Sequence, residues 1–133
     1  MKIDYVFLKD VLMVFENYEK HEIENIKLAK NIGLDFNNID ESLLDKFIGH
    51  IKILGDNLCI ESSSPTFGFS HNVRSDNYIV VSAIYRLTQQ GYEFLEILKQ
   101  KTIVEKIKNL SISSAIEIGK PLLVEFLKKQ LIG

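Results

Sequence analysis

The sequence contains a single cysteine, Cys59, and lacks any long run of apolar residues. One cysteine excludes an internal disulfide framework and is typical of proteins kept in a reducing cytoplasm. A membrane-spanning helix needs about 20 predominantly apolar residues in succession, so none is predicted. Charged residues at positions 4, 9 and 10 interrupt the apolar N-terminus, and no small-residue cleavage site follows them. The sequence therefore does not predict a signal peptide, and we expect a cytoplasmic protein.

The residue patterns of common catalytic and cofactor sites are also missing. The stretch HEIEN at 21–25 has Asn25 where a zinc-binding helix would carry its second histidine. The glycines are isolated and form no phosphate-binding loop, and the three histidines are scattered. Cys59 lies in an apolar stretch without a neighbouring base, as expected of an inert buried thiol. We expect no catalytic residue, no metal and no cofactor, and hence a protein that is not an enzyme.

The composition that remains is that of a folded domain with an uneven charge distribution. Hydrophobic residues make up 46% of the 133 residues and charged residues 26%, which are values of a globular protein with one core. Residues 1–63 carry 7 Lys or Arg against 12 Asp or Glu, a net charge of −5. Residues 64–133 carry 9 against 6, a net charge of +3. Any surface that binds nucleic acid is therefore expected in the C-terminal half.

Hydrophobic periodicity predicts two helices in the first half of the chain. Apolar residues at three-to-four-residue spacing predict the first over residues 3–18, buried on more than one side. A second is predicted over 40–55, with Asp40 as its cap and Gly55 at its end. Residues 19–38 leave two alternatives open, a short helix ending at Gly33 or a short strand followed by a turn.

The middle of the chain predicts a hairpin, and the rest predicts helices. A strand is expected in NLCIE (57–61), a loop over 62–77 and a second strand over 78–87. Thr88 is expected to cap a helix that runs to about Lys101, followed by further helical segments. Pro121 lacks an amide donor and disfavours helical geometry at the preceding residue, so we expect a break or kink there.

This order of elements predicts an α+β protein of the winged helix-turn-helix type. Residues 1–87 would form the winged-helix-like part, with the loop 62–77 as its wing. Residues 88–133 would form a C-terminal helical extension packed on the same core, so that the chain is one domain overall. Such extensions often dimerise, and we expect a possible homodimer through these helices.

The segment YRLTQQGYEFLEIL (85–98) carries a family resemblance. It resembles the R-L-T-x-x-G-H-E-F-L core of small prophage- and bacterium-encoded proteins of unknown function. The chain departs from that family at Tyr92, where the family has histidine, and at Val104, where it has tryptophan. The resemblance implies a phage or mobile-element setting in a bacterial host and a winged-helix-like fold, but it implies no reaction.

Three groups of residues are candidates for binding. The free face of the helix at 40–55 is expected to present Ser42, Lys46 and His50, which are either a recognition surface for DNA or an ordinary solvated face. The aromatic and cationic residues of the loop are either anchors for a partner or, in the case of the phenylalanines, part of the core. These loop residues are Phe67, Phe69, His71 and Arg74. The basic cluster consists of Lys99, Lys101, Lys106 and Lys108.

Two functional hypotheses follow. The first is a phage or mobile-element accessory protein that binds a protein partner, for example as an inhibitor of a host defence system. It rests on the acidic first half, the near-neutral helix surface and the aromatic loop. The alternative is a winged-helix DNA-binding transcriptional regulator, which rests on the predicted fold and the basic cluster.

Overall fold

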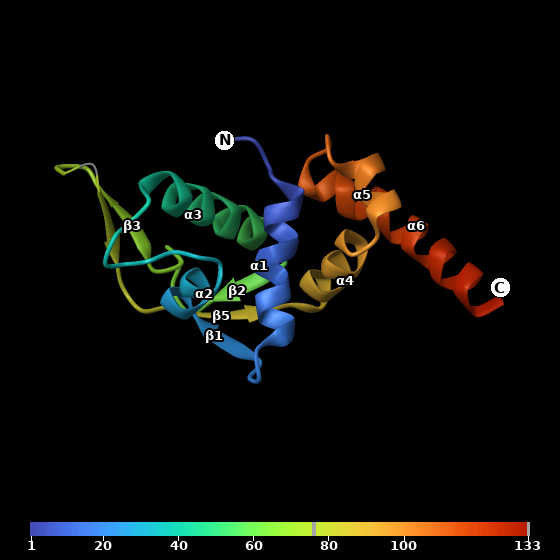
Figure 1. The fold of residues 1–133 in the computed structure, drawn as a ribbon, viewed down its shortest axis with the longest axis horizontal. Coiled ribbons are helices and arrows are strands. Elements are labelled where there is room, and N and C mark those ends of the chain that lie inside the picture. Colours follow the sequence, from blue (N-terminus) through green and yellow to red (C-terminus); the bar gives the residue numbers. More distant parts are fainter. Residues whose placement is uncertain (76, 133) are drawn as a thin grey trace.

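The computed structural model describes residues 1–75 and 77–132 and shows a mixed α+β protein (Figure 1). Asp76, which falls within the predicted loop 62–77, and Gly133 lie outside the described residues. Within the described residues the chain forms six helices and five short strands. The α+β class predicted from the sequence is confirmed.

Helix α1 (Tyr5–Asn17) begins at Asp4, whose carboxylate accepts a hydrogen bond from the Phe7 amide at 3.0 Å. This bond satisfies one of the amides that a helix start leaves unpaired. The helix buries an apolar stripe formed by Tyr5, Leu8, Val11, Leu12 and Phe15. The predicted helix over 3–18 is confirmed, except that its first two residues are not helical and its last lies just beyond the helix end.

Residues 19–38 contain both elements that the sequence left as alternatives. Strand β1 (Glu22–Glu24) leads directly into helix α2 (Asn25–Asn31), and Gly33 follows with a φ of 104°. Asn25 is fully buried at this junction. Its side chain donates to the carbonyl of Val81 and accepts from the amide of Ala83, which ties α2 to the strand region.

Helix α3 (Glu41–Asp56) begins as predicted and ends differently. Asp40 caps it by accepting a hydrogen bond from the Leu43 amide at 3.1 Å. The left-handed residue after the helix is Leu58, with a φ of 59°, so the predicted role of Gly55 as the end of the helix is wrong. Gly55 instead provides space, because a Cβ atom there would lie 2.2 Å from the Phe67 ring.

The strands are shorter and more numerous than the sequence predicts. Strand β2 (Ile60–Ser62) overlaps the first predicted strand, and the predicted loop 62–77 contains strand β3 (Phe69–Asn72). The predicted strand 78–87 is two strands, β4 (Asn77–Val80) and β5 (Ile84–Leu87). The chain bends between them, where the Val81 amide bonds to the Gly68 carbonyl and the Asn25 side chain binds the backbone. A single period-two pattern over 78–87 does not reveal this bend.

The strands form two small antiparallel sheets. In the first, β5 lies between β1 and β2, and Arg86 is the register partner of both Glu22 and Glu61. In the second, β3 pairs only with β4, and this hairpin extends from the end of the molecule that also holds the start of α3 (Figure 1).

Three helices complete the chain. Helix α4 (Gln89–Leu98) follows the cap residue Thr88, and α5 (Lys101–Ile107) and α6 (Ile112–Ile132) come next. Helix α6 continues through Pro121, so of the predicted break or kink the break is wrong. The proline leaves the carbonyl of Glu117 without its helical partner, and both residues lie at the surface, where water can take the place of the missing amide.

Helix α1 lies between the two parts of the molecule (Figure 1). It packs against α2 and β5 on one side and against α4 on the other. The Tyr5 and Phe94 rings meet edge to face with their centres 6.4 Å apart, and the Tyr5 hydroxyl donates to the carbonyl of Leu110. The C-terminal helices therefore share a core with the first part of the chain.

Candidate binding surface on helix α3 and the β3–β4 hairpin

The N-terminal residues cover part of α3 that the sequence analysis expected to be free. Lys46 forms an ion pair with Asp4 at 2.7 Å, and its ammonium group lies 4.8 Å from the centre of the Phe7 ring. Gly49 lies against Met1, whose sulfur would be 2.5 Å from a Cβ atom at that position. Of the three predicted surface residues, Ser42 is exposed, Lys46 is half-buried and His50 is fully buried.

His50 is a structural residue, and its predicted place on the free face is a correction. Its Nε2 atom accepts a hydrogen bond from the Asp4 amide at 2.9 Å, and Nδ1 lies 2.7 Å from the Lys46 carbonyl. This pair of contacts requires a neutral ring with its proton on Nδ1. Burial lowers the pKa of His50, and the charge of Lys46 acts in the same direction, while the Lys46 carbonyl and Asp4 oppose them.

The part of α3 that stays exposed is acidic. Glu41, Ser42 and Asp45 are exposed along its first two turns. Asp45 accepts a hydrogen bond at 2.9 Å from the hydroxyl of Tyr78 on strand β4, which ties α3 to the hairpin. With Lys46 held by Asp4, this surface presents carboxylates and a hydroxyl rather than cations.

Both phenylalanines of the predicted loop belong to the interior, the second of the two alternatives that the sequence left open. Phe69 is fully buried, and its ring meets the Phe47 ring edge to face with the ring centres 5.9 Å apart. Phe67 is half-buried, lies 5.8 Å from the Tyr85 ring and accepts a hydrogen bond from the Tyr85 hydroxyl through its carbonyl. Neither phenylalanine is available as an exposed anchor.

The other two loop residues lie at the surface of the hairpin. His71 is exposed on β3, and its ring meets the Tyr78 ring edge to face at 5.7 Å. Arg74 is exposed beyond the end of β3, and its backbone amide donates to the Asn72 side chain. Of the four predicted loop residues, Phe67 and Phe69 therefore lie in the interior, whereas His71 and Arg74 lie at the surface of the hairpin.

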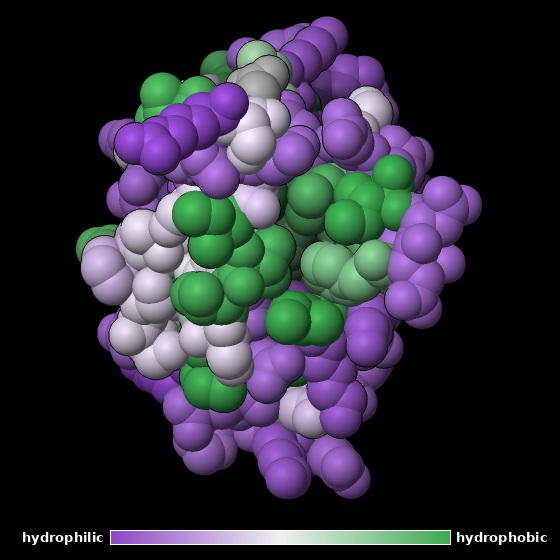
Figure 2. Space-filling view, turned by 90° about the vertical axis from the view of Figure 1, so that its left-hand side faces the viewer, coloured by the Kyte–Doolittle hydropathy of each residue, from purple (hydrophilic) through white to green (hydrophobic). Residues whose placement is uncertain are grey.

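A groove of about 490 Å³ lies between the start of α3 and the hairpin. Its lining combines an apolar floor with two carboxylates and consists of Ile39, Glu41, Leu44, Asp45, His71, Asn77, Tyr78 and Val80. The end of the molecule that carries the hairpin shows apolar side chains gathered between polar ones (Figure 2). The sequence did not predict this groove, because residues 69–72, which form β3, were assigned to a loop. The aromatic and β-branched residues of 78–80 did indicate the strand β4 that lines it.

The predicted basic cluster is divided by ion pairs. Lys99 binds both Glu16 and Glu96, at 2.8 and 2.9 Å, and Lys108 binds Glu105 at 2.7 Å. Lys101 and Lys106 are exposed. Carboxylates are therefore interleaved with the lysines, and the four residues do not form an uninterrupted cationic surface.

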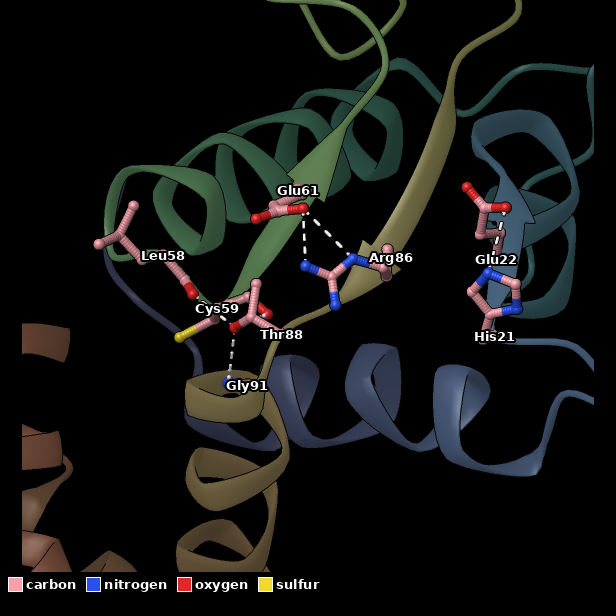
Figure 3. A network of polar contacts seen from close by, with 8 residues as sticks. All are labelled: His21, Glu22, Leu58, Cys59, Glu61, Arg86, Thr88 and Gly91. Atoms are coloured by element: carbon pink, nitrogen blue, oxygen red, sulfur yellow. Dashed lines mark hydrogen bonds and ion pairs between the residues drawn. The ribbon is translucent and has the colours of Figure 1, made fainter.

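The residues of the β5–α4 junction, the segment that carries the family resemblance, make structural contacts. Arg86 pairs with Glu61 of the neighbouring strand β2 at 2.7 Å (Figure 3). The Thr88 hydroxyl accepts from the Gly91 amide at 3.0 Å and donates to the Leu58 carbonyl. A Cβ atom at Gly91 would lie 2.1 Å from the Cys59 carbonyl, so only glycine allows this close approach.

The same region gives no sign of a reactive group. Cys59 is fully buried, and burial raises the pKa of its thiol to about 12, so the thiol stays protonated at neutral pH. Across residues 1–75 and 77–132, no three His, Cys, Asp or Glu side chains are grouped as a metal site. No helix in this described part of the chain is long and apolar enough to cross a bilayer.

No family model, no curated protein and no solved structure matches this chain.

Proposed function

We propose that this protein is a winged-helix-type accessory protein of a phage or mobile element that acts, without catalysing a reaction, by binding another protein. The element order supports the winged-helix part of the proposal. Helix α1, strand β1, helices α2 and α3 and then β2 precede the hairpin, and the returning strand β5 lies between β1 and β2. In this arrangement α3 takes the position of the recognition helix and the β3–β4 hairpin that of the wing.

The charge of α3 is the main observation in favour of a protein partner over DNA. DNA readout uses Arg, Asn or Gln aimed at base edges and cations against phosphates. The sequence of α3, ESLLDKFIGHIKILGD, contains no Arg, Asn or Gln, and its exposed first turns carry Glu41 and Asp45. Two carboxylates at this position would repel a phosphate backbone, whereas they suit a basic segment of a protein.

The groove beside α3 also supports a protein partner. An apolar floor with a charged rim is the usual anatomy of a protein-binding site. We propose that a partner places an apolar side chain against Leu44 and Val80 and a Lys or Arg near Glu41 and Asp45. The setting comes from the resemblance of residues 86–95 to prophage-encoded proteins, which makes a host protein, for example a component of a defence system, the expected partner.

Charge reversal on α3 tests this proposal. We expect a bacterial host lysate to yield a partner that binds the wild type, and we expect the Glu41→Lys/Asp45→Lys variant to bind the purified partner at least about tenfold more weakly, or about 1.4 kcal/mol. The matched control is Glu19→Lys/Glu22→Lys, which makes the same charge change at exposed residues outside the groove. Failure to capture any stable partner, or equal binding by both variants, contradicts the proposal.

A DNA-binding regulator is the second candidate, and the exposed Arg74 on the hairpin favours it. A wing can place an arginine in a minor groove. This candidate predicts retention on DNA at about 50 mM salt, where the electrostatic contribution is strong, and weaker retention of the Arg74→Ala and Lys46→Ala variants. Absence of retention at that salt concentration removes this candidate and leaves the protein-binding proposal untouched.

A further inference from the structure

Residues 1–4, which we call the strap, precede helix α1 and lie against the middle of α3 (Figure 1). The backbone amide of Asp4 donates to Nε2 of His50 at 2.9 Å, and the Asp4 carboxylate pairs with the Lys46 ammonium group at 2.7 Å. In the part of the chain that the structure describes, these two polar contacts join the strap to α3. One residue of the strap, Asp4, therefore makes both of them.

Solvent weakens one of these contacts more than the other. The side chains of Lys46 and Asp4 are 38% and 39% exposed, and an ion pair with this exposure contributes little to stability. His50 is fully buried, so its hydrogen bond with the Asp4 amide is shielded from water and is stronger for that reason. The bond between Asp4 and His50 is therefore the contact that decides whether the strap stays in place.

The strap has room to move away from α3. Its first two residues are exposed, and the Met1 side chain meets α3 at Gly49, where a Cβ atom would lie 2.5 Å from the Met1 sulfur. An open cleft of about 930 Å³ borders the strap between α3 and α5. The strap can leave α3 without displacing a residue of the core.

The closed strap requires a neutral His50 ring. Nε2 accepts the hydrogen bond from Asp4, so the ring proton is on Nδ1, which lies 2.7 Å from the Lys46 carbonyl. A protonated ring carries an N–H group on both nitrogens. The new N–H would point at the N–H of Asp4, and two donors do not form a hydrogen bond. The closed strap and a charged ring at position 50 are therefore incompatible.

The surroundings of His50 also disfavour a charge while the strap is closed. Burial lowers the pKa of His50 and the charge of Lys46 adds to this effect, whereas the Lys46 carbonyl and the Asp4 carboxylate raise the pKa. Helix α1 contributes the uncharged Phe7 ring. Further charged side chains line the cleft beside the strap, namely Lys2, Asp45, Glu105 and Lys108. Opening of the strap ends the burial of the ring, so the open form binds a proton more readily than the closed form.

We propose that the strap is a pH-sensitive cover of α3, closed while the His50 ring is neutral and released when Nε2 of that ring takes up a proton. The Asp4 carboxylate keeps its hydrogen bond from the Phe7 amide, so α1 stays intact and the residues before it move. Release uncovers the middle of α3 at Lys46, Gly49 and His50. This device goes beyond the proposed function, because it needs no partner and the groove beside α3 contains no strap residue.

A nitroxide spin label on the strap tests this inference. The Lys2→Cys variant provides an exposed attachment point, and the natural Cys59 is fully buried and stays unlabelled. We expect low label mobility at about pH 8 and high mobility at about pH 5, with a midpoint below about 6.5, the pKa of an unperturbed histidine. Between the His50 pKa values of the closed and open forms, each pH unit should change the ratio of open to closed strap about tenfold. A control label at Lys101→Cys, an exposed position on α5, should have the same mobility at both pH values.

Two further measurements assign the release to His50. The titration of the His50 ring, followed by nuclear magnetic resonance in the full-length protein, should have the same midpoint as the release of the label. In the His50→Gln variant, where no charge forms at position 50, label mobility should not change between about pH 5 and pH 8. The far-ultraviolet circular dichroism spectrum of the wild type should be constant over this range, because the helices stay folded.

Three results would overturn the inference. The first is a label whose mobility does not change with pH in the wild type, which would show that the Asp4 carboxylate holds the charged ring in place. The second is a pH-dependent release that persists in the His50→Gln variant. The third is a release that coincides with loss of the helical circular dichroism signal, which would show unfolding of the protein and not movement of the strap.

Discussion

His50 shows how one buried side chain can join residues that are far apart in the chain. Its ring joins the Asp4 amide to the Lys46 carbonyl, and it meets the Phe7 ring edge to face, with the ring centres 5.1 Å apart. The contact with Asp4 holds residues 1–4 over α3. His50, which was expected on the free face of α3, thus helps to cover part of that face.

Protonation of His50 should weaken the fold. Because its folded-state pKa lies below the value of about 6.5 in an unfolded chain, the unfolded chain binds the proton more readily at acidic pH. We expect the free energy of unfolding to be constant above about pH 6.5 and to decrease as the pH falls below it, by about 1.4 kcal/mol for each unit of difference between the two pKa values. Urea titrations from about pH 5 to pH 8 measure this dependence.

Two variants separate His50 from the other histidines. The His50→Gln variant should have a lower free energy of unfolding by about 1–3 kcal/mol at neutral pH, because a buried hydrogen-bond network is disturbed. It should also lose most of the dependence on pH between about 5 and 7. The control His21→Gln, at an exposed position, should keep the wild-type dependence. Equal pH dependence in wild type and His50→Gln would contradict the role assigned to His50.

At the scale of elements, the β5–α4 junction connects a sheet to the C-terminal helices. Thr88 caps α4 and at the same time binds the backbone that follows α3, through the carbonyls of Leu58 and Cys59. Gly91 then lets the first turn of α4 lie against the Cys59 carbonyl. Hydrogen bonds of Thr88 and the close packing of Gly91 therefore account for these two residues of the segment that carries the family resemblance.

The cap at Thr88 should be measurable as stability. The Thr88→Ala variant removes the acceptor of the Gly91 amide, so we expect a loss of about 1–2 kcal/mol in the free energy of unfolding. The matched control Thr88→Ser keeps the hydroxyl and should lose less than half of that. Equal losses in the two variants, measured by urea denaturation, would show that the methyl group and not the hydroxyl is what matters.

At the scale of the whole molecule, the two parts of the chain share α1. Tyr5 contacts Phe94 and Leu110, and Glu16 at the other end of α1 pairs with Lys99. Contacts along the length of α1 leave no obvious boundary at residue 88. We therefore expect residues 1–87 and 88–133 to unfold together.

The Phe94→Ala variant tests this cooperativity. Phe94 is fully buried, and its truncation should cost about 3–5 kcal/mol in the free energy of unfolding. Because the two parts share one core, far-ultraviolet circular dichroism, which reports on the helices, should change together with the fluorescence of the tyrosines. Unfolding of the C-terminal helices in a separate, earlier transition would contradict the single cooperative unit.

Local signals in the sequence determined a substantial part of this fold. Asp40 and Thr88 cap the helices that they were expected to cap, and apolar spacing located α1 and α3. These features depend on residues within a few positions of one another, so one-dimensional patterns are sufficient to identify them.

Other features were decided by contacts between residues far apart in the chain. His50 is buried by residues 1–7, Phe69 is buried against Phe47, and Asn25 fixes the bend at residues 81–83. The groove between α3 and the hairpin exists only because β3 and β4 fold beside the start of α3. A sequence pattern records which residues are apolar or charged, but only the tertiary structure decides which of them cover one another, because burial depends on neighbours that the local sequence does not contain.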